Sequence, residues 1–150
     1  MFRGRFSHTI DAKGRVSIPS GFRLELQGSN EQAPIVTNGV TVAGECLWLY
    51  RYEDWVEYES HLVGLAPDNL DVQAYVRFMV SGASECPIDS QGRTLLPAFL
   101  REHAKLGREV TIAGVGGRIE IWNKALFDQN QTSTQEDFQR IASVVAGLGR

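Results

Sequence analysis

A motif of thirteen residues occurs twice in this chain of 150 residues. The stretch DAKGRVSIPSGFR at residues 11–23 returns 78 positions later as DSQGRTLLPAFLR at residues 89–101. Five of the thirteen positions are identical: Asp11/Asp89, Gly14/Gly92, Arg15/Arg93, Pro19/Pro97 and Arg23/Arg101. Ordinary residue frequencies would give about one match over such a length. The motif therefore indicates a duplicated structural unit.

The first copy predicts two strands joined by a tight turn. Apolar and polar residues alternate in FSHTI (6–10) and in RVSI (15–18), as they do in half-buried strands. Between them, residues 11–14 match a type I turn, with aspartate first and with glycine fourth, where it can adopt positive φ. Pro19 then ends the second strand and starts a short helix, which we expect to run to Gly28.

The second copy repeats this order and continues it. A turn is expected at residues 89–92, and a helix after Pro97 that ends at Gly107. Downstream, LWLYRYEDW (47–55) and IEIWNKALF (119–127) share an arrangement of apolar and aromatic residues at a spacing of 72, so the first copy carries six extra residues in its middle. The tryptophans in and near these stretches are expected in the core: Trp48, Trp55 and Trp122.

A unit of strand, turn, strand, helix and two further strands is too small to bury a sizeable core alone. Two such units in one chain can pair around a pseudo-twofold axis and close a small barrel, which also covers the strand edges. The predicted fold class is α+β, mainly β. We place the first repeat at residues 5–54, a helical linker at 55–82, the second repeat at 83–126 and a C-terminal amphipathic helix at 127–150.

The linker and the C-terminal segment both show helical periodicity. WVEYESHLVGL (55–65) and LDVQAYVRFMVSGAS (70–84) predict two helices, packed against the barrel or against a neighbouring subunit. In STQEDFQRIASVVAGL (133–148), Ser133 and Glu136 match a capping box before an apolar helix face. This helix is expected either to pack back on the core or to dock on another subunit.

Positive charge is concentrated at the N-terminus of an otherwise acidic chain. The formal net charge is −3, yet residues 1–23 carry basic side chains against Asp11 alone. These basic residues are Arg3, Arg5, Lys13, Arg15 and Arg23. A cationic patch on an acidic body can bind a polyanion at one face and repel it elsewhere. The alternative is a basic terminal segment without a binding role.

The composition argues against a membrane, secreted or redox protein. No apolar run approaches the roughly 18 residues of a membrane span. The start MFRGRFSH (1–8) lacks the apolar segment of a secretory signal. Cys46 and Cys86 have no metal or redox spacing, so we expect them to be buried thiols in the reducing cytoplasm.

The sequence contains no catalytic or cofactor-binding motif. His8, His61 and His103 fall in different elements, without carboxylate or cysteine partners at metal-ligand spacing. The glycine-rich AGVGGRIEIW (113–122) precedes a strand and does not open a helix, so it predicts a hairpin turn and not a phosphate loop. No nucleophile motif such as G-x-S-x-G occurs. We therefore expect a protein that is not an enzyme and that uses no cofactor, metal or small-molecule substrate.

The repeated motif resembles that of the MraZ family of bacterial transcriptional regulators. The resemblance rests on the tandem D-x-x-G-R turns with their prolines, the helical linker, the MFRG start at residues 1–4 and ASEC at residues 83–86. It covers the chain from Met1 to Phe127. Proteins of this family contain two AbrB-like (SpoVT–AbrB) units, which implies a pseudo-twofold swapped-hairpin, or double-split, β-barrel.

The same resemblance implies a function and an assembly. It implies sequence-specific binding of double-stranded DNA at short direct repeats in a promoter, by a homo-oligomer that forms an octamer-like or larger closed ring. The implied outcome is repression of the division and cell-wall gene cluster, including the protein's own gene, in the cytoplasm and nucleoid. In this family the D-x-x-x-R hairpins form the DNA-binding surface, an assignment that carries over to Asp11, Arg15, Asp89 and Arg93.

The residues of the hairpins are expected to have different roles. Arg15 and, at the hairpin tip, Lys13 are expected to contact DNA, since an arginine can bridge to phosphate or fork to guanine O6 and N7. The alternative for Arg15 is a purely structural ion pair with Asp11. A carboxylate facing phosphates would repel them, so the aspartates are assigned to the turns. The turn-forming and orienting residues are Asp11, Gly14, Asp89 and Gly92.

The second copy lacks much of the positive charge of the first. Arg3 and Arg5 are expected to contact DNA as a short N-terminal arm. The places of Arg3, Arg5 and Lys13 are taken in the second copy by Ser81, Ala83 and Gln91. We therefore expect the first hairpin to dominate DNA affinity.

The remaining arginines of the motif are expected to contribute less to direct DNA contact. Arg93 either contacts DNA or serves mainly as architecture. Arg23 and Arg101 follow the prolines on helices, and are expected to orient a hairpin or to form an ion pair between subunits.

Three other functions fit the same sequence less well. An AbrB-type antitoxin-like protein pairs a DNA-binding barrel with a toxin-neutralising tail, but the C-terminal capping box and the second barrel unit argue against it. A ring-forming scaffold without DNA binding predicts that binding is absent or unaffected by salt. A hydrolase lacks any sequence signature here.

Overall fold

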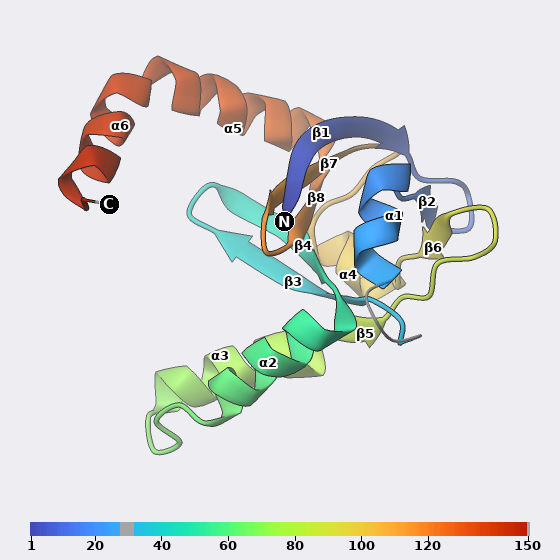
Figure 1. The fold of residues 1–150 in the computed structure, drawn as a ribbon, viewed down its shortest axis with the longest axis horizontal. Helices are drawn as coiled ribbons and strands as arrows, with labels where there is room; N and C mark the ends of the chain where they lie inside the picture. The colour runs from blue at the N-terminus through green and yellow to red at the C-terminus, as the bar shows by residue number, and fades with distance from the viewer. Residues whose placement is uncertain (28–31, 150) are drawn as a thin grey trace.

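The computed structural model describes residues 1–27 and 32–149, with strands at its centre and helices on two sides (Figure 1). The first repeat, extended at its N-terminus, supplies β1 (Phe2–Thr9), β2 (Arg15–Ser17), α1 (Ser20–Gln27), β3 (Ile35–Thr41) and β4 (Gly44–Tyr50). The linker forms α2 (Tyr52–Val63) and α3 (Leu70–Ser81). The second copy supplies β5 (Ser84–Glu85), β6 (Arg93–Leu95), α4 (Ala98–His103), β7 (Glu109–Gly116) and β8 (Ile119–Asn123). The C-terminal segment forms α5 (Lys124–Glu136) and α6 (Phe138–Gly147).

The two motif copies exchange strands. One antiparallel sheet has the order β1-β7-β8-β4-β3-β5, and β2 pairs with β6 in a separate ribbon. This order places equivalent strands of the two copies at symmetric positions, so the first strand of each copy pairs with the third strand of the other. A pseudo-twofold axis passes through the pairs Trp48–Glu120 and Val16–Thr94, around which the flanking register is symmetric.

The structure confirms the predicted α+β, mainly β fold with interleaved copies. It differs from the expected barrel because the described strands do not close into one ring. The sheet and the ribbon are linked by the single bridges Ile10–Val16 and Ile88–Thr94. Within the described residues they do not join into one continuous closed ladder. The reason is that β2 and β6, three residues each, leave the sheet after one bridge and pair with each other across the axis.

The first strand is longer than its sequence pattern predicts. It starts at Phe2, and its eight residues all pair with β7. Phe2 and Phe6 both contact Phe22 of α1 edge-on, with ring centroids 5.5 and 5.2 Å apart. The pattern hides this start because an arginine–glycine–arginine stretch breaks the alternation of polar and apolar residues.

The sheet buries apolar side chains on both faces. On β4, Leu47 and Leu49 belong to the cluster that includes residues of α1 and α4. Trp48 and Tyr50 point the other way, into the cluster that includes residues of α2, α3 and α5. Three tryptophans are buried, as the sequence predicts: Trp48, Trp55 and Trp122.

Both cysteines are free, buried thiols, as expected. Burial raises the pKa of Cys86 to about 11 and raises that of Cys46 further. Both thiols therefore remain protonated and unreactive at neutral pH.

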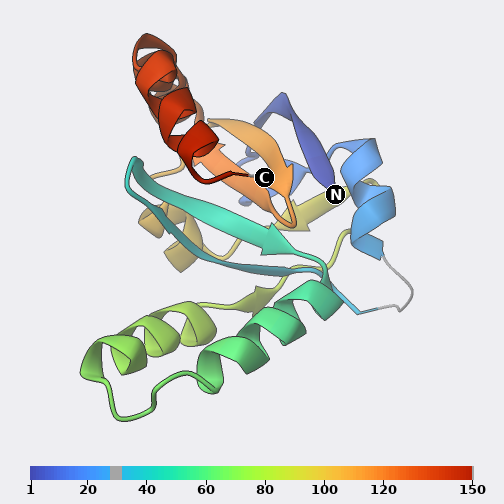
Figure 2. The same ribbon diagram turned by 60° about the vertical axis from the view of Figure 1, so that its left-hand side comes forward.

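The linker folds into the two predicted helices, which pack against the sheet through Trp55 and Met79. Asn69 caps α3, because its side chain accepts hydrogen bonds from two N–H groups of the first turn. The hydroxyls of Tyr58 and Tyr75, 2.8 Å apart, join the two helices. In Figures 1 and 2 the green α2 and α3 lie on one side of the strands, opposite the red α6.

The predicted C-terminal capping box is wrong. Ser133 lies inside α5, which begins earlier because the side chain of Asn123 accepts a hydrogen bond from the N–H of Leu126. The helix is interrupted at Asp137, and the chain continues as α6, which buries no residue against the rest of the chain. Packing of this helix on the core is therefore also wrong. Large apolar side chains are exposed on α6 and at its C-cap: Phe138, Val144, Val145 and, at the cap, Leu148.

The helices of the motif begin where the prolines predict, and the second of them ends earlier than expected. α1 and α4 start directly after Pro19 and Pro97. The end expected at Gly28 lies outside the described residues. α4 ends before Gly107, and Lys105 takes the left-handed conformation with φ of 54°.

Two leucines on α1 provide a matched test of the core. Leu26 is 1% exposed and Leu24 is 75% exposed. We expect Leu26→Ala to lower the free energy of unfolding by about 2–5 kcal/mol, since it leaves a cavity. Leu24→Ala should change it by less than about 0.5 kcal/mol. Urea unfolding followed by circular dichroism measures both, and equal effects would contradict the assigned orientation of α1.

Candidate nucleic-acid interface

The two D-x-x-G-R turns lie next to each other at one end of the molecule. The N–H of Leu96 donates to the carbonyl of Gly14 at 3.0 Å, and the N–H of Ile18 donates to the carbonyl of Gly92 at 2.9 Å. These crossed hydrogen bonds join the base of each turn to the other motif copy. In Figure 1 both loops project beyond β2 and β6, on the side away from α6.

The first turn is held by its aspartate. The N–H of Asp11 donates to the carbonyl of Arg15, and the N–H of Gly14 donates to the carbonyl of Asp11, at 2.9 and 3.0 Å. Oδ1 of Asp11 accepts from the N–H groups of Lys13 and Arg15, at 2.9 and 3.0 Å. Gly14 has φ of +90°, a conformation that L side chains rarely adopt. The aspartate is thus bound by the turn that it organises.

Arg15 is paired with the same aspartate. Its Nε donates to Oδ2 of Asp11 at 2.7 Å, and both side chains are about one-third exposed, at 32% and 35%. Among the described residues the two terminal nitrogens of this guanidinium have no hydrogen-bond partner. The ion pair therefore fixes the direction of Arg15 and leaves its outer edge available.

The hydrogen bonds and charge around Asp11 lower its pKa to about 2. The largest contribution is the backbone N–H of Arg15, and the Arg15 guanidinium and the N–H of Lys13 add to it. The carboxylate is therefore charged at every physiological pH, and its charge is matched within the turn.

The second turn has the same geometry with a longer ion pair. Oδ1 of Asp89 accepts from the N–H groups of Gln91 and Arg93, both at 2.9 Å. Nε of Arg93 donates to Oδ2 of Asp89 at 3.2 Å. Gly92 has φ of +81°. The N–H groups of this turn, Arg93 first, lower the pKa of Asp89.

The tips of the two turns differ in charge. Lys13 is exposed at the first tip, and Gln91 is exposed at the second. The two motif copies together contain five cationic side chains and only two carboxylates, and both carboxylates already accept hydrogen bonds from N–H groups. These cations are Lys13, Arg15, Arg23, Arg93 and Arg101.

Arg3 and Arg5 are not brought to the turns. They lie in β1, where they pair with Val115 and Ala113 of β7, so this segment is a sheet strand and not a free arm. The guanidinium of Arg5 lies over the ring of Phe127, 5.7 Å from its centroid. At about 3.3 Å per residue, Arg5 is roughly 20 Å along the strand from Asp11.

The structure places three further arginines at this end of the molecule. Arg108 lies beside the first turn, because its carbonyl accepts a hydrogen bond from the N–H of Ile10 at 2.8 Å. The Arg108 residue is exposed. Arg101 and Arg23 each lie against the turn of the other motif copy. No signal in the sequence marks Arg108, whereas the two helix arginines were visible as part of the repeat.

In residues 1–27 and 32–149 no helix is long and apolar enough to cross a membrane. The same residues contain no cluster of His, Cys, Asp or Glu side chains that could hold a metal ion.

The low pKa of Asp11 predicts an acid-dependent loss of stability. The unfolded value is about 3.9, so the stability from charged Asp11 is fully present above about pH 4 and is lost as the pH falls towards 2. We expect Asp11→Asn to remove this part of the pH dependence of urea unfolding, whereas Asp68→Asn, in the exposed turn between α2 and α3, should leave it intact. A carboxyl NMR titration of Asp11 with a midpoint near 4 would contradict the assignment.

The positive φ of Gly14 predicts a specific cost for a side chain. We expect Gly14→Ala to lower the free energy of unfolding by about 1–3 kcal/mol, because the backbone is strained and the new Cβ would meet Arg101. Gly107→Ala is the matched control, since it has no such φ and no atom within 4 Å of a Cβ. Thermal or urea unfolding of the two variants tests this, and a neutral Gly14→Ala is the contrary result.

Comparison with known proteins identifies the family of the chain. The family described as "MraZ protein, putative antitoxin-like" matches residues 1–71 and 79–145. The chain is 44% identical over 149 residues to the "Transcriptional regulator MraZ" of Alkaliphilus oremlandii (strain OhILAs), covering 99% of each protein. It is 43% identical over 142 residues to the protein of that name from Thermoanaerobacter sp. (strain X514), covering 95% of this chain and 94% of the relative.

A third relative shows the same extent of similarity. The "Transcriptional regulator MraZ" of Desulforamulus reducens is 41% identical over 148 residues, covering 99% of each protein. Both motif copies and both turns fall within the matched residues. The chain therefore belongs to the MraZ family, a family of transcriptional regulators and not of enzymes.

Proposed function

We propose that this protein regulates transcription by sequence-specific binding of double-stranded DNA through its two D-x-x-G-R turns. The observation that carries the proposal is the placement of both turns side by side at one exposed end, each with its arginine oriented by an aspartate. Two neighbouring loops that each present an arginine can enter one groove or span adjacent phosphates of a duplex.

The chemistry of each turn suits a polyanion. The outer edge of Arg15 can fork to guanine O6 and N7 or bridge to a phosphate. Lys13 at the tip is placed to contact phosphate. Asp11 does not repel DNA strongly, because N–H groups and the guanidinium already bind its oxygens. Arg93 takes the corresponding role in the second turn.

The first turn contributes more than the second in this proposal. It carries Lys13 where the second carries Gln91, and its arginine is held more tightly, at 2.7 Å against 3.2 Å. Arg3 and Arg5 lie further along β1 and would reach only DNA that follows this strand past the loops.

The proposed form of the protein is a ring of subunits that binds direct repeats in a promoter. One pair of loops offers few base contacts, and several subunits on spaced sites multiply weak binding through effective concentration. The apolar side chains exposed on α6 support an interface between subunits. The target that the family resemblance suggests is the division and cell-wall gene cluster, including the protein's own gene, with repression in the cytoplasm and nucleoid as the outcome.

A second candidate is an antitoxin-like role, which the words of the matched family description favour. In that case α6 would bind an unrelated protein chain instead of another subunit. A scaffold without DNA binding is the third candidate. Size-exclusion chromatography with light scattering on the full chain separates a homo-oligomer from a protein that needs a partner.

Substitution of the two arginines tests the DNA-binding proposal. In gel-shift titrations on the DNA upstream of this protein's own gene, we expect Arg15→Ala to weaken binding about tenfold or more, with the oligomer unchanged. Arg93→Ala should cost less. Arg77→Ala, on the exposed part of α3, is the control and should have little effect.

Three outcomes would count against the proposal. Unchanged binding by Arg15→Ala would show that the turns are not the contact surface. A larger effect of Arg93→Ala would refute the inequality of the two turns. If the affinity for DNA does not fall as the salt concentration is raised, neutralisation of phosphates is excluded and the scaffold is favoured.

A further inference from the structure

We propose that Arg101 and Arg23 are positioning residues, each of which holds the DNA-binding turn of the other motif copy. Arg101 of α4 would hold the first turn, and Arg23 of α1 would hold the second. The inference rests on the proposed function for its consequence in DNA binding, but the contacts themselves are independent of DNA.

The spacing from proline to arginine places both side chains. The N–H of Arg23 donates to the carbonyl of Pro19 at 3.0 Å, and the N–H of Arg101 donates to the carbonyl of Pro97 at 3.1 Å. Each arginine therefore sits one helical turn after its proline, on the same face of its helix as the proline. Both arginines are half-buried, and each lies where the turn of the other copy contacts its helix.

Arg101 lies directly against Gly14. A Cβ on Gly14 would lie 2.8 Å from Cζ of Arg101 and 2.9 Å from its Nη2, so only glycine leaves room for the guanidinium. Nε of Arg101 donates to the carbonyl of Leu96 at 3.0 Å, and the N–H of Leu96 donates to the carbonyl of Gly14. Arg101 thus packs on the turn and is hydrogen-bonded to Leu96, the residue that itself binds the turn.

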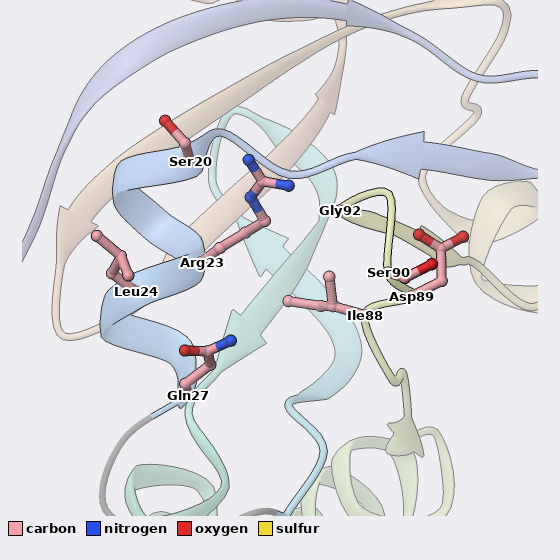
Figure 3. Close-up of a pocket in the computed structure, with 8 residues that line it drawn as sticks. All are labelled: Ser20, Arg23, Leu24, Gln27, Ile88, Asp89, Ser90 and Gly92. Carbon is pink, nitrogen blue, oxygen red and sulfur yellow. The ribbon is translucent and has the colours of Figure 1, made fainter.

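Arg23 makes the equivalent contact with Gly92. A Cβ on Gly92 would lie 2.6 Å from Cζ of Arg23. Figure 3 shows Arg23 extending from α1 towards the loop that carries Gly92, with Ile88 and Asp89 on the other wall of the groove. Among the described residues Arg23 makes no hydrogen bond with its guanidinium, so this contact is one of packing.

The contacts explain why glycine and the second arginine recur together in the motif. A flat guanidinium can lie against a peptide only where no Cβ intervenes, and a lysine ammonium cannot fill the same space. Gly14 immediately precedes Arg15, so the position of Arg101 sets the direction from which Arg15 leaves the turn. The pairing is crossed between the copies, and the sequence repeat alone does not show this.

The two contacts are unequal. Arg101 has a hydrogen bond to Leu96 in addition to its packing on Gly14, whereas Arg23 has packing alone. The better-held turn is also the one that carries Lys13 and Arg15. We therefore expect Arg101 to matter more for DNA affinity than Arg23.

Hydrogen exchange of the free protein tests the crossed contact without DNA. Arg101→Met should speed amide exchange in a peptide covering residues 11–15 at least severalfold more than in one covering 89–93, although 89–93 is nearer in sequence. Arg23→Met should show the reverse pattern. Equal changes in both peptides, or a change confined to the variant's own motif copy, would overturn the inference.

A double-mutant cycle tests the consequence for binding. Arg101→Met should weaken promoter binding about tenfold in the wild-type and Arg93→Ala backgrounds, and should add little to Arg15→Ala, because it acts through the same turn. A direct phosphate contact by Arg101 would give the same loss in all three backgrounds and would refute the positioning role.

Two further variants separate position from charge. Arg101→Lys keeps the charge but loses the planar group, so we expect it to weaken promoter binding nearly as much as Arg101→Met does. Arg108→Met removes a charge at the same end without touching a turn, and should cost less than Arg101→Met. If Arg101→Met does not fold, Arg101→Lys carries the cycle. If Arg15→Ala leaves binding unchanged while exchange is crossed, the proposed function fails and the positioning contact stands.

Discussion

The rest of the structure depends on the apolar core that the two copies share, and the reciprocal hydrogen bonds from Leu96 to Gly14 and from Ile18 to Gly92 join the copies at their turns. Each hydrogen bond joins the base of one turn to the residue that directly follows the short strand of the other copy. They accompany the pairing of β2 with β6 across the pseudo-twofold axis, in the same exchange that pairs the first strand of each copy with the other copy. Neither copy could bury its core without the other, because their strands and helices share the same apolar clusters.

This exchange also sets the arrangement of the candidate interface. Because the axis runs between β2 and β6, both turns emerge at the same end, and their arginines are presented together. Aspartate binds the backbone of its own turn and leaves the outer edge of the arginine available. Symmetry in the backbone does not extend to the charges, since Lys13 has no cationic counterpart at Gln91.

Much of the fold was predictable, and the failures have particular causes. The turns, the proline helix starts, the linker helices and the buried tryptophans follow from local signals of a few residues. The capping box at Ser133 failed because an earlier cap, Asn123, starts a helix that runs through it. The sequence pattern did not show that Arg3 and Arg5 lie in a sheet strand, because their backbone partners in β7 are more than a hundred residues away in the chain.

The sequence by itself determined the turns, since aspartate, glycine and arginine within five residues carry most of the groups that close them. It also determined that there are two of them, and that only one has a lysine at its tip. The tertiary structure alone decided which strands pair and which arginine lies on which glycine. Backbone N–H and carbonyl groups are the same in either copy, so hydrogen bonding cannot choose between pairing within and between copies. Packing of the shared core makes that choice, and with it places Arg101 against Gly14 and Arg23 against Gly92.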